Sequence, residues 1–263
     1  MKNSNIEWTD KTWNPTTGCT ICSKECTNCY ALNFTNQFQF TNPKYNKGFN
    51  VFVEHHYELN KPFTWKKPSI VFVNSMSDLF HEQCSVDFIK KVFKVMNSTP
   101  QHTYQILTKR HHRLVELSSQ LHWTDNIWMG VSVGNVAGVR RIQALKKTQA
   151  KNKFLSVEPL IEELPNLNLE GIDWVIVGGE SGSNAREIKK DWVLKVQQDC
   201  KLFSVSFFFK QWGDSKFNPD PIDPTRIKGN PLYSKGGCQI DGKIYRENPC
   251  LKIQAFGQLT FEY

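Results

Sequence analysis

The sequence predicts an α/β fold, a complete or partial TIM-like (β/α) barrel, and three observations support this prediction. First, short runs of β-branched and aromatic residues recur along the chain, and each run ends in polar residues. Second, segments with apolar residues at helical spacing follow most of these runs, which is the pattern of βαβ units around a parallel sheet. Third, the runs are almost continuously apolar, as expected of strands that are covered on both faces.

In chain order, a first strand is expected near the cysteine-rich segment. Later strands are expected at 69–78, 103–110, 126–135, 153–160, 173–182 and 205–214. Helices are expected at 85–98, 111–121, 136–148 and 189–203. The first of these helices carries apolar residues at i, i+3 and i+6 or i+7 from Val86 onward. Seven such units suit a barrel. A doubly wound open sheet is the alternative, but no GxGxxG follows any predicted strand.

The domain organisation is predicted as a barrel over residues 1–214 and a C-terminal extension over 215–263 that packs on it. The extension is punctuated by Pro and Gly, and its segment GGCQIDGKIYRENP predicts a hairpin. No apolar leader segment opens the chain, and its apolar runs are of strand length, too short to span a bilayer. We therefore expect a cytoplasmic protein with no membrane partner.

The chain has 263 residues and a formal net charge of +8. Such a charge is compatible with a nucleic acid or another phosphate-bearing partner, and equally with a solvated basic surface. Four of its eight cysteines fall in TTGCTICSKECTNCYA, at Cys19, Cys22, Cys26 and Cys29. In a reducing compartment, clustered cysteines favour metal or redox chemistry over disulfides.

Three kinds of metal site compete for these cysteines. Four thiolates can hold a structural zinc ion, although three residues between the two CxxC pairs make the geometry cramped. Four can also hold an electron-transfer iron–sulfur cluster. Three on a [4Fe–4S] cluster would leave one iron open for a ligand. Cys22, Cys26 and Cys29, followed by Tyr30, match the CxxxCxxC spacing of radical S-adenosylmethionine (SAM) enzymes.

The carboxyl ends of the predicted strands are rich in hydrogen-bonding groups, which predicts a lined pocket at that edge of the sheet. These positions are Asn74, Ser75, Ser77, Asp78, Thr108, Lys109, Arg110, Ser132, Asn135, Glu158, Gly178, Gly179, Glu180, Ser181, Lys210, Gln211 and Trp212. By contrast, His81, His111 and His112 lack a nearby ligand at helical spacing and are interpreted as ordinary polar residues.

Long motifs extend this picture over nearly the whole chain, from Ile6 to about Pro249. They are IEWTDKTWNPTTGC, CTNCYA, FVNSMSDLFHE, QILTKR, GVSV, SVEPL, IDWVIVGGESG and FFFKQWG. Together they resemble a largely uncharacterised three-cysteine-motif family, often encoded by phages and mobile elements and regarded as a radical-SAM-like (β/α) barrel. The family pattern is WNPxxGC, a six-residue gap and CxxCYA. It implies that Cys19, Cys26 and Cys29 hold the cluster and that Cys22 is an addition.

The resemblance implies that the reduced cluster cleaves SAM to methionine and a 5′-deoxyadenosyl radical, which abstracts hydrogen from a substrate. Acceptors for the SAM ammonium would come from Asn74, Ser75, Ser77 and Asp78, which can equally cap a helix. A cation for its carboxylate would be Lys109 or Arg110. Other expected cofactor contacts are Ser132, Gly179 and Glu180, and the expected catalytic residues are Glu158 and Lys210.

Two functions follow. The first is a radical SAM enzyme that modifies or repairs a nucleic acid or nucleotide-like substrate, with an electron donor such as flavodoxin or ferredoxin. The alternative is a non-catalytic module, stapled by zinc or an iron–sulfur cluster, that binds nucleic acid or protein. SAM-dependent methyl transfer is disfavoured because the first loop is not rich in glycine.

Overall fold

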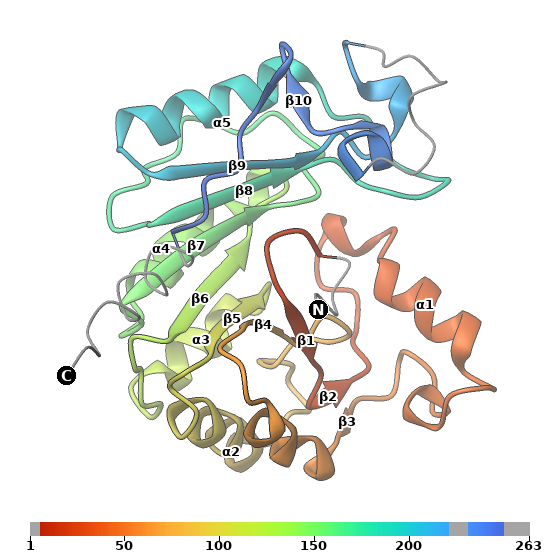
Figure 1. The fold of residues 1–263 in the computed structure, drawn as a ribbon, viewed down its shortest axis with the longest axis vertical. Helices are drawn as coiled ribbons and strands as arrows, with labels where there is room; N and C mark the ends of the chain where they lie inside the picture. The colour runs from red at the N-terminus through yellow and green to blue at the C-terminus, as the bar shows by residue number, and fades with distance from the viewer. Residues whose placement is uncertain (1–5, 221–230, 250–263) are drawn as a thin grey trace. The chain divides into compact units, whose positions relative to one another are not determined.

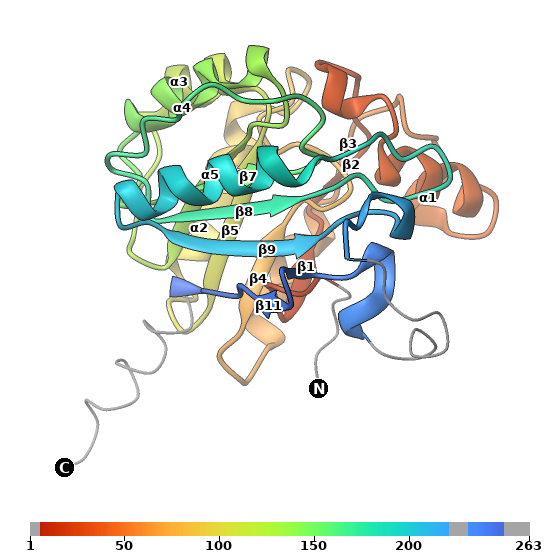
Figure 2. The same cartoon turned by 90° about the horizontal axis from the view of Figure 1, so that it is seen from above.

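The computed structural model describes residues 6–220 and 231–249 of a mixed α/β chain (Figures 1 and 2). Two compact units are present. The first contains the chain up to Ser132 together with Arg140–Lys153, and the second contains Val133–Val139 and the chain from Phe154 onward. The described part of the predicted C-terminal extension belongs to the second unit, and the proposed boundary at residue 214 stays a prediction. No helix in the two described ranges is both long and apolar enough to cross a membrane.

The first unit is built on four parallel strands whose order in the sheet follows the chain. They are β1 (Lys11–Trp13), β4 (Ile70–Val73), β5 (Thr103–Thr108) and β6 (Ile127–Ser132). Every residue of β4 and β6 is buried, which explains their uninterrupted apolar sequences. A separate short antiparallel pair joins β2 (Thr16–Thr17), just after β1 in the chain, to β3 (Val53–Glu54).

The register of these strands aligns their carboxyl ends. Trp13 pairs with Val73, Val73 with Ile106, and Thr108 with Val131. The loops that follow β1, β4 and β5 therefore begin at the same edge of the sheet. This edge carries the cysteine-rich segment and the polar residues that follow β4 and β5.

Helices α2, α3 and α4 cover the first unit as predicted, and shorter turns surround the cysteines. The helical elements are η1 (Lys24–Cys26), α1 (Tyr30–Phe38), η2 (Pro43–Tyr45), η3 (His56–Thr64), α2 (Val86–Asn97), α3 (His111–Ser118) and α4 (Arg140–Lys146). The Ser85 side chain starts α2 by accepting a hydrogen bond from the Phe88 amide at 3.2 Å. Figure 2 shows α3 and α4 side by side.

The second unit has three parallel strands, again in chain order. Its elements are η4 (Val136–Gly138), β7 (Asn152–Val157), β8 (Trp174–Gly178), α5 (Lys190–Leu202), β9 (Ser206–Gln211), η5 (Ser215–Phe217), η7 (Pro231–Gly236), β10 (Gln239–Ile240) and β11 (Lys243–Ile244). Figure 1 shows α5 lying along β8 and β9. The predicted hairpin is confirmed, because β10 and β11 are antiparallel.

The segment after this hairpin covers the outer edge of β9. The Phe209 amide donates to the Tyr245 carbonyl at 2.9 Å, and the Glu247 amide donates to the Phe207 carbonyl at 3.3 Å. The Arg246 guanidinium lies 5.0 Å from the centre of the Phe208 ring. These contacts close an edge that would otherwise expose unpaired backbone groups.

The predicted strands, helices and parallel pairing are confirmed in the described part of the chain. The first strand, β1, lies just before the cysteines and pairs with β4 as βα units require. Within neither unit does the strand order reverse, whereas a doubly wound sheet requires a reversal. These features agree with a complete or partial (β/α) barrel, and the radical SAM type of that fold is taken up below as a proposal.

Candidate functional site

The cysteine loop, defined as residues 18–29, connects the strands at the start of the first unit to α1, and Cys29 is the N-cap of that helix. Gly18 has φ +83, and a Cβ atom there would lie 2.1 Å from the Val51 carbonyl oxygen. The Cys19 amide donates to the Phe49 carbonyl at 2.8 Å. Glycine is therefore required at position 18 for close packing on the 49–51 backbone.

The four thiols have different surroundings. Cys19 and Cys29 pack against an apolar cluster formed by Ala31, Tyr45, Phe49 and Met76. Cys22 is exposed and lies near Cys26, whose sulfur is 3.5 Å from the Ser23 hydroxyl. Cys26, which is a metal ligand in every interpretation of the loop, thus contacts Ser23. Of the two cysteines that compete for the third ligand position, Cys19 lies in an apolar environment and Cys22 in a polar one.

These surroundings separate the thiol pKa values. The hydrogen bond from Cys22 outweighs the effect of burial and, with the Lys109 ammonium nearby, lowers the pKa of Cys26 to about 4. The same hydrogen bond and burial raise the pKa of Cys22. Burial raises the pKa of Cys19 to about 11. These directions favour the thiolate form of Cys26, which is the form that binds metals.

The donor set of the loop is sulfur alone, which suits zinc or an iron–sulfur cluster. Within residues 6–220 and 231–249, no three His, Cys, Asp or Glu side chains are gathered closely enough to hold a metal ion. The chemistry of the donors thus fits a cluster, and the thiols would have to draw together to hold one.

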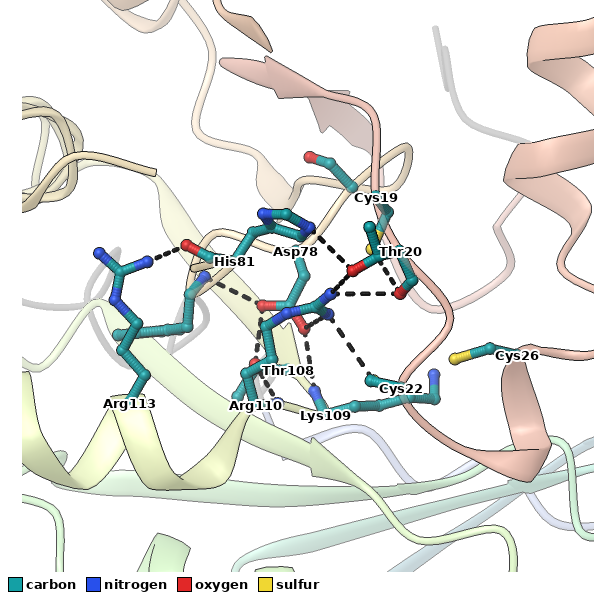
Figure 3. A network of polar contacts seen from close by, with 12 residues as sticks. Cys19, Thr20, Cys22, Cys26, Asp78, His81, Thr108, Lys109, Arg110 and Arg113 are labelled. Carbon is teal, nitrogen blue, oxygen red and sulfur yellow. Dashed lines mark hydrogen bonds and ion pairs between the residues drawn. The ribbon is translucent and has the colours of Figure 1, made fainter. Parts of the chain in front are cut away.

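Asp78 is the centre of a buried network behind the loop (Figure 3). One of its carboxylate oxygens accepts from the Phe80 amide at 2.9 Å and the Thr108 hydroxyl at 2.7 Å. The other accepts from the Lys109 amide at 3.1 Å and from Arg110 Nη1 at 3.4 Å. With four donors on two oxygens, this carboxylate joins the loops after β4 and β5 and has little capacity left for a SAM ammonium.

Arg110 joins this network to the cysteine loop, as Figure 3 shows. Its Nε donates to both carboxylate oxygens of Glu82, and its Nη1 also lies 3.7 Å from Cys22 Sγ. Its Nη2 donates to the Thr20 carbonyl at 3.2 Å and to the Thr20 hydroxyl at 2.9 Å. Each guanidinium nitrogen thus has a partner, so Arg110 positions the loop and is committed to that role.

Lys109 is the other cation predicted to bind the carboxylate of SAM. In the part of the chain that the structure describes, no carboxylate forms an ion pair or hydrogen bond with its ammonium, which lies near enough to Cys26 to lower that thiol's pKa. Of the two cations predicted for a cofactor carboxylate, Lys109 is therefore the available one, and Arg110 is not.

Asn74, Ser75 and Ser77 connect the loop after β4 to the segment before Cys19. Asn74 Oδ1 accepts from the Thr16 amide at 3.3 Å, and the Ser77 hydroxyl lies 2.5 Å from the Thr16 hydroxyl. The Ser75 hydroxyl donates to Asn14 Oδ1 at 3.1 Å. Asn74 is buried with φ +61, and its Nδ2 has no hydrogen-bond partner among the described residues. These side chains therefore fix the path of the chain into the cysteine loop.

Glu25, inside the cysteine loop, forms a second buried anchor. Its Oε1 accepts from Arg141 Nη1 of α4 at 2.7 Å, and the same Nη1 donates to the Ser132 carbonyl at 2.7 Å. Burial alone would raise the pKa of Glu25, but the Ser23 hydrogen bond and the Arg141 charge outweigh it and lower that pKa to about 2. Ser132 thus contributes its carbonyl, while its fully buried hydroxyl has no partner in the described ranges.

We expect Glu25→Gln to lower the free energy of unfolding by about 2–4 kcal/mol at pH 7, because Arg141 loses its buried partner. The folded-state pKa of Glu25 lies below the unfolded value, so the pair stabilises above pH about 4.5 and loses this effect as pH falls toward 2. Urea titrations of both proteins at pH 7 and pH 3 measure this. Glu163→Gln, which breaks an exposed pair with Lys195, is the control and should cost less than about 1 kcal/mol. If the difference in the free energy of unfolding between wild type and Glu25→Gln is as large at pH 3 as at pH 7, the Glu25–Arg141 pair is not its cause.

His81 has structural contacts at the same edge, which agree with its interpretation as an ordinary polar residue. It is buried, stacks on Phe52 with ring centres 4.7 Å apart, and its Nε2 lies 3.1 Å from the Thr20 hydroxyl. Its Nδ1 accepts from the Gln83 amide, so the ring proton is on Nε2 and faces Thr20. Burial and Arg110 lower the pKa of His81, which keeps the ring neutral.

The remaining predicted residues lie in the second unit, at the carboxyl ends of β7, β8 and β9. Lys210 Nζ and Glu158 Oε1 form an ion pair at 2.5 Å, and both side chains are mostly buried. The Glu158 carboxyl group lies over Gly178, where a Cβ atom would meet it at 3.4 Å. The structure therefore brings together the two residues predicted as catalytic.

Glu180, Gly179 and Trp212 have structural contacts. Glu180 is buried and pairs with Arg186 through two nitrogens of the guanidinium. At Gly179, a Cβ atom would lie 2.0 Å from the Trp212 carbonyl oxygen. Trp212 is fully buried and donates to the Gln239 carbonyl at 2.8 Å. These contacts explain the GGESG and KQWG motifs as packing between the loops after β8 and β9.

Sequence reasoning did not single out Glu25 and Arg141. One signal was present, since Glu25 is the only acidic residue between Lys11 and Val53. An isolated acid inside a run of cysteines suggests a specific partner. That partner, Arg141, is 116 residues away, and only the fold identifies it.

Comparison with known proteins gives a family and no function. No curated protein and no solved structure matches the chain. A family model described as "Protein of unknown function (DUF5131)" matches residues 3–249. That span holds all the predicted site residues and the networks described above. The chain therefore belongs to the uncharacterised DUF5131 family.

Proposed function

We propose that this protein is a radical SAM enzyme that holds a [4Fe–4S] cluster through Cys19, Cys26 and Cys29. The observation that carries the proposal is a thiol-only loop at the carboxyl edge of a parallel sheet, anchored at two points by buried arginines. Catalytic groups of (β/α) folds gather at this edge. These arginines hold the loop through Thr20 and Glu25 rather than through Cys19, Cys26 or Cys29, which suits a metal site better than a packing role.

The protein's own residues would bind and orient the cofactor. Lys109 would hold a carboxylate of SAM, because its ammonium is uncommitted and lies beside Cys26. Arg110 and Asp78 would position the loop without touching the cofactor. When bound, the cluster would supply one electron, received from a donor such as flavodoxin or ferredoxin, to cleave SAM into methionine and a 5′-deoxyadenosyl radical.

In the second unit, Glu158 and Lys210 are proposed to act on the substrate. The two side chains are mostly buried and in direct contact. The Glu158 carboxylate can accept a proton from a substrate, and the Lys210 ammonium can donate one. Gly178 leaves room beside the carboxyl group, which a larger side chain would fill. Glu180 is less suited to substrate or cofactor binding, since Arg186 already holds its carboxylate.

A four-thiolate zinc module that binds nucleic acid or protein is the second candidate, and the proximity of Cys22 to Cys26 favours it. This proximity brings Cys22, the fourth thiol, to Cys26, which with Cys29 is a ligand in every interpretation of the loop. Four thiolates would close the coordination shell and leave no open position for SAM.

Anaerobic reconstitution with iron and sulfide separates the two candidates. The enzyme should become brown, bind about four irons per chain as a [4Fe–4S] cluster requires, and release 5′-deoxyadenosine from SAM on reduction with dithionite. A colourless protein that retains one zinc ion and releases no 5′-deoxyadenosine would overturn the first candidate in favour of the second.

A further inference from the structure

The surface around the cysteine loop has an unusual charge composition. Between Lys11 and Val53 the only acidic residue is Glu25, and it is buried against Arg141. The same stretch contains Lys11, Lys24, Lys44 and Lys47, of which Lys44 is paired with Glu58, and eight Asn or Gln residues lie between Lys24 and Phe52. No carboxylate of this segment therefore faces solvent in the described structure, so its exposed surface suits a polyanion.

Aromatic side chains are exposed on the same surface. Tyr30, Phe34 and Phe38 follow one another at four-residue intervals along α1, beginning one residue after Cys29. Tyr30 is 55% exposed and Phe34 is 40% exposed, and Phe40, just beyond the helix, is 93% exposed. We call Tyr30, Phe34, Phe38 and Phe40 the aromatic face. Phe38 is partly buried against the apolar cluster of Ala31, Tyr45, Phe49 and Met76, whereas the other three rings are exposed. Large apolar side chains exposed in one segment mark a candidate binding surface.

Contacts within the protein hold these rings in place. The Tyr30 hydroxyl donates to the Ser75 carbonyl, which fixes the ring while leaving much of it exposed. Phe34 contacts Phe38 and Tyr45, with ring centres 4.5 Å and 5.5 Å apart. In both ribbon views α1 lies at the outside of the first unit (Figures 1 and 2). The rings are thus ordered before any ligand arrives, which lowers the entropic cost of binding.

The spacing of the rings distinguishes single strands from duplexes. Four residues of α-helix rise about 6 Å, whereas successive bases of a duplex are about 3.4 Å apart along each strand. A duplex also keeps the faces of its bases stacked on one another. A single strand with separated bases can place them on successive rings, while lysines neutralise its phosphates.

We propose that the aromatic face binds single-stranded nucleic acid and delivers a nucleotide to the cysteine loop. This names the substrate class of the proposed enzyme and in that respect rests on the proposed function. The binding step itself needs neither cluster nor SAM. Tyr30 adjoins Cys29 in sequence, so a base on its ring would lie at the entrance to the loop.

The test measures binding of fluorescein-labelled oligonucleotides by anisotropy with the full chain in its apo form. A 15-nucleotide dT strand should bind more tightly than a duplex of the same length. In the double variant Tyr30→Leu/Phe34→Leu, Kd for dT should rise at least about tenfold, because leucine keeps apolar volume but offers no ring face. Phe63→Leu removes another exposed ring of the first unit and should leave Kd unchanged.

Two further variants keep the test decisive. Phe40→Ala changes a side chain that is 93% exposed, so it should fold normally and still raise Kd severalfold. Lys47→Gln should reduce the slope of log Kd against log salt by about 1, while Lys90→Gln on α2 should not. Equal binding by wild type and the leucine variant, or tighter binding of duplex, would overturn the proposal. If the chain binds dT but releases no 5′-deoxyadenosine, the enzyme proposal fails and this inference stands.

Discussion

Cys19→Ala should lose most of the iron that the reconstituted wild type binds and all of its SAM cleavage, whereas Cys22→Ala should retain both. The resemblance implies Cys19 as the third ligand, and the structure packs this half-buried thiol and Cys29 against one apolar cluster. Cys22 is exposed, and its sulfur already receives a hydrogen bond from Arg110. Iron content, visible absorbance and 5′-deoxyadenosine release measure the difference.

Cys200→Ala is the matched control, because it removes one thiol from α5 in the second unit and should change neither iron content nor cleavage. The opposite pattern, with iron lost in Cys22→Ala and kept in Cys19→Ala, would establish the CxxxCxxC register of Cys22, Cys26 and Cys29. Equal losses in both variants would mean that four thiols bind the metal, and the radical SAM proposal would then lose its open iron.

The strands could be predicted from the sequence because parallel strands buried on both faces carry a local signature. SIVFV, NIWMGVS and DWVIVGG are apolar over the full length of a strand, and the structure places β4, β6 and β8 there. The order of the strands followed from the alternation with helices. The division of the chain into two compact units could not be predicted from the sequence. Neither a Gly- and Pro-rich segment nor a change in composition lies between Ser132 and Phe154.

The roles of polar residues at the strand ends were harder to predict, because a polar side chain after a strand can serve either a ligand or a neighbouring loop. Ser77 contacts Thr16, and Asp78 contacts Arg110, which are 61 and 32 residues away. Such partners depend on the register between β1, β4 and β5, which the sequence does not specify. Lys109 and Arg110 are adjacent and chemically similar, yet only Arg110 is committed to internal contacts.

Arg110→Met should lower the free energy of unfolding by about 3–5 kcal/mol, the largest stability effect that we expect from one substitution at the site. Methionine preserves much of the apolar stem of the arginine side chain, so the loss of stability measures the contribution of the guanidinium group. Burial alone would lower the pKa of Arg110, but Asp78 and the nearby thiols raise it, so the charge is firmly held. Removing one member of a buried charged pair leaves the other unpaired in a medium of low dielectric constant. Urea denaturation at pH 7 measures the change.

A double-mutant cycle with Asp78→Asn separates this network from a general effect of packing. If the two charges stabilise each other, the double variant should lose less than the sum of the single losses, by at least about 1 kcal/mol. Arg140→Met, an exposed arginine of α4, should change stability by less than about 0.5 kcal/mol. Because Nη2 holds Thr20, Arg110→Met should also speed hydrogen exchange of the backbone amides around Thr20 in the folded protein. Unchanged exchange together with additive losses would show that Arg110 stabilises the strand edge without positioning the cysteine loop.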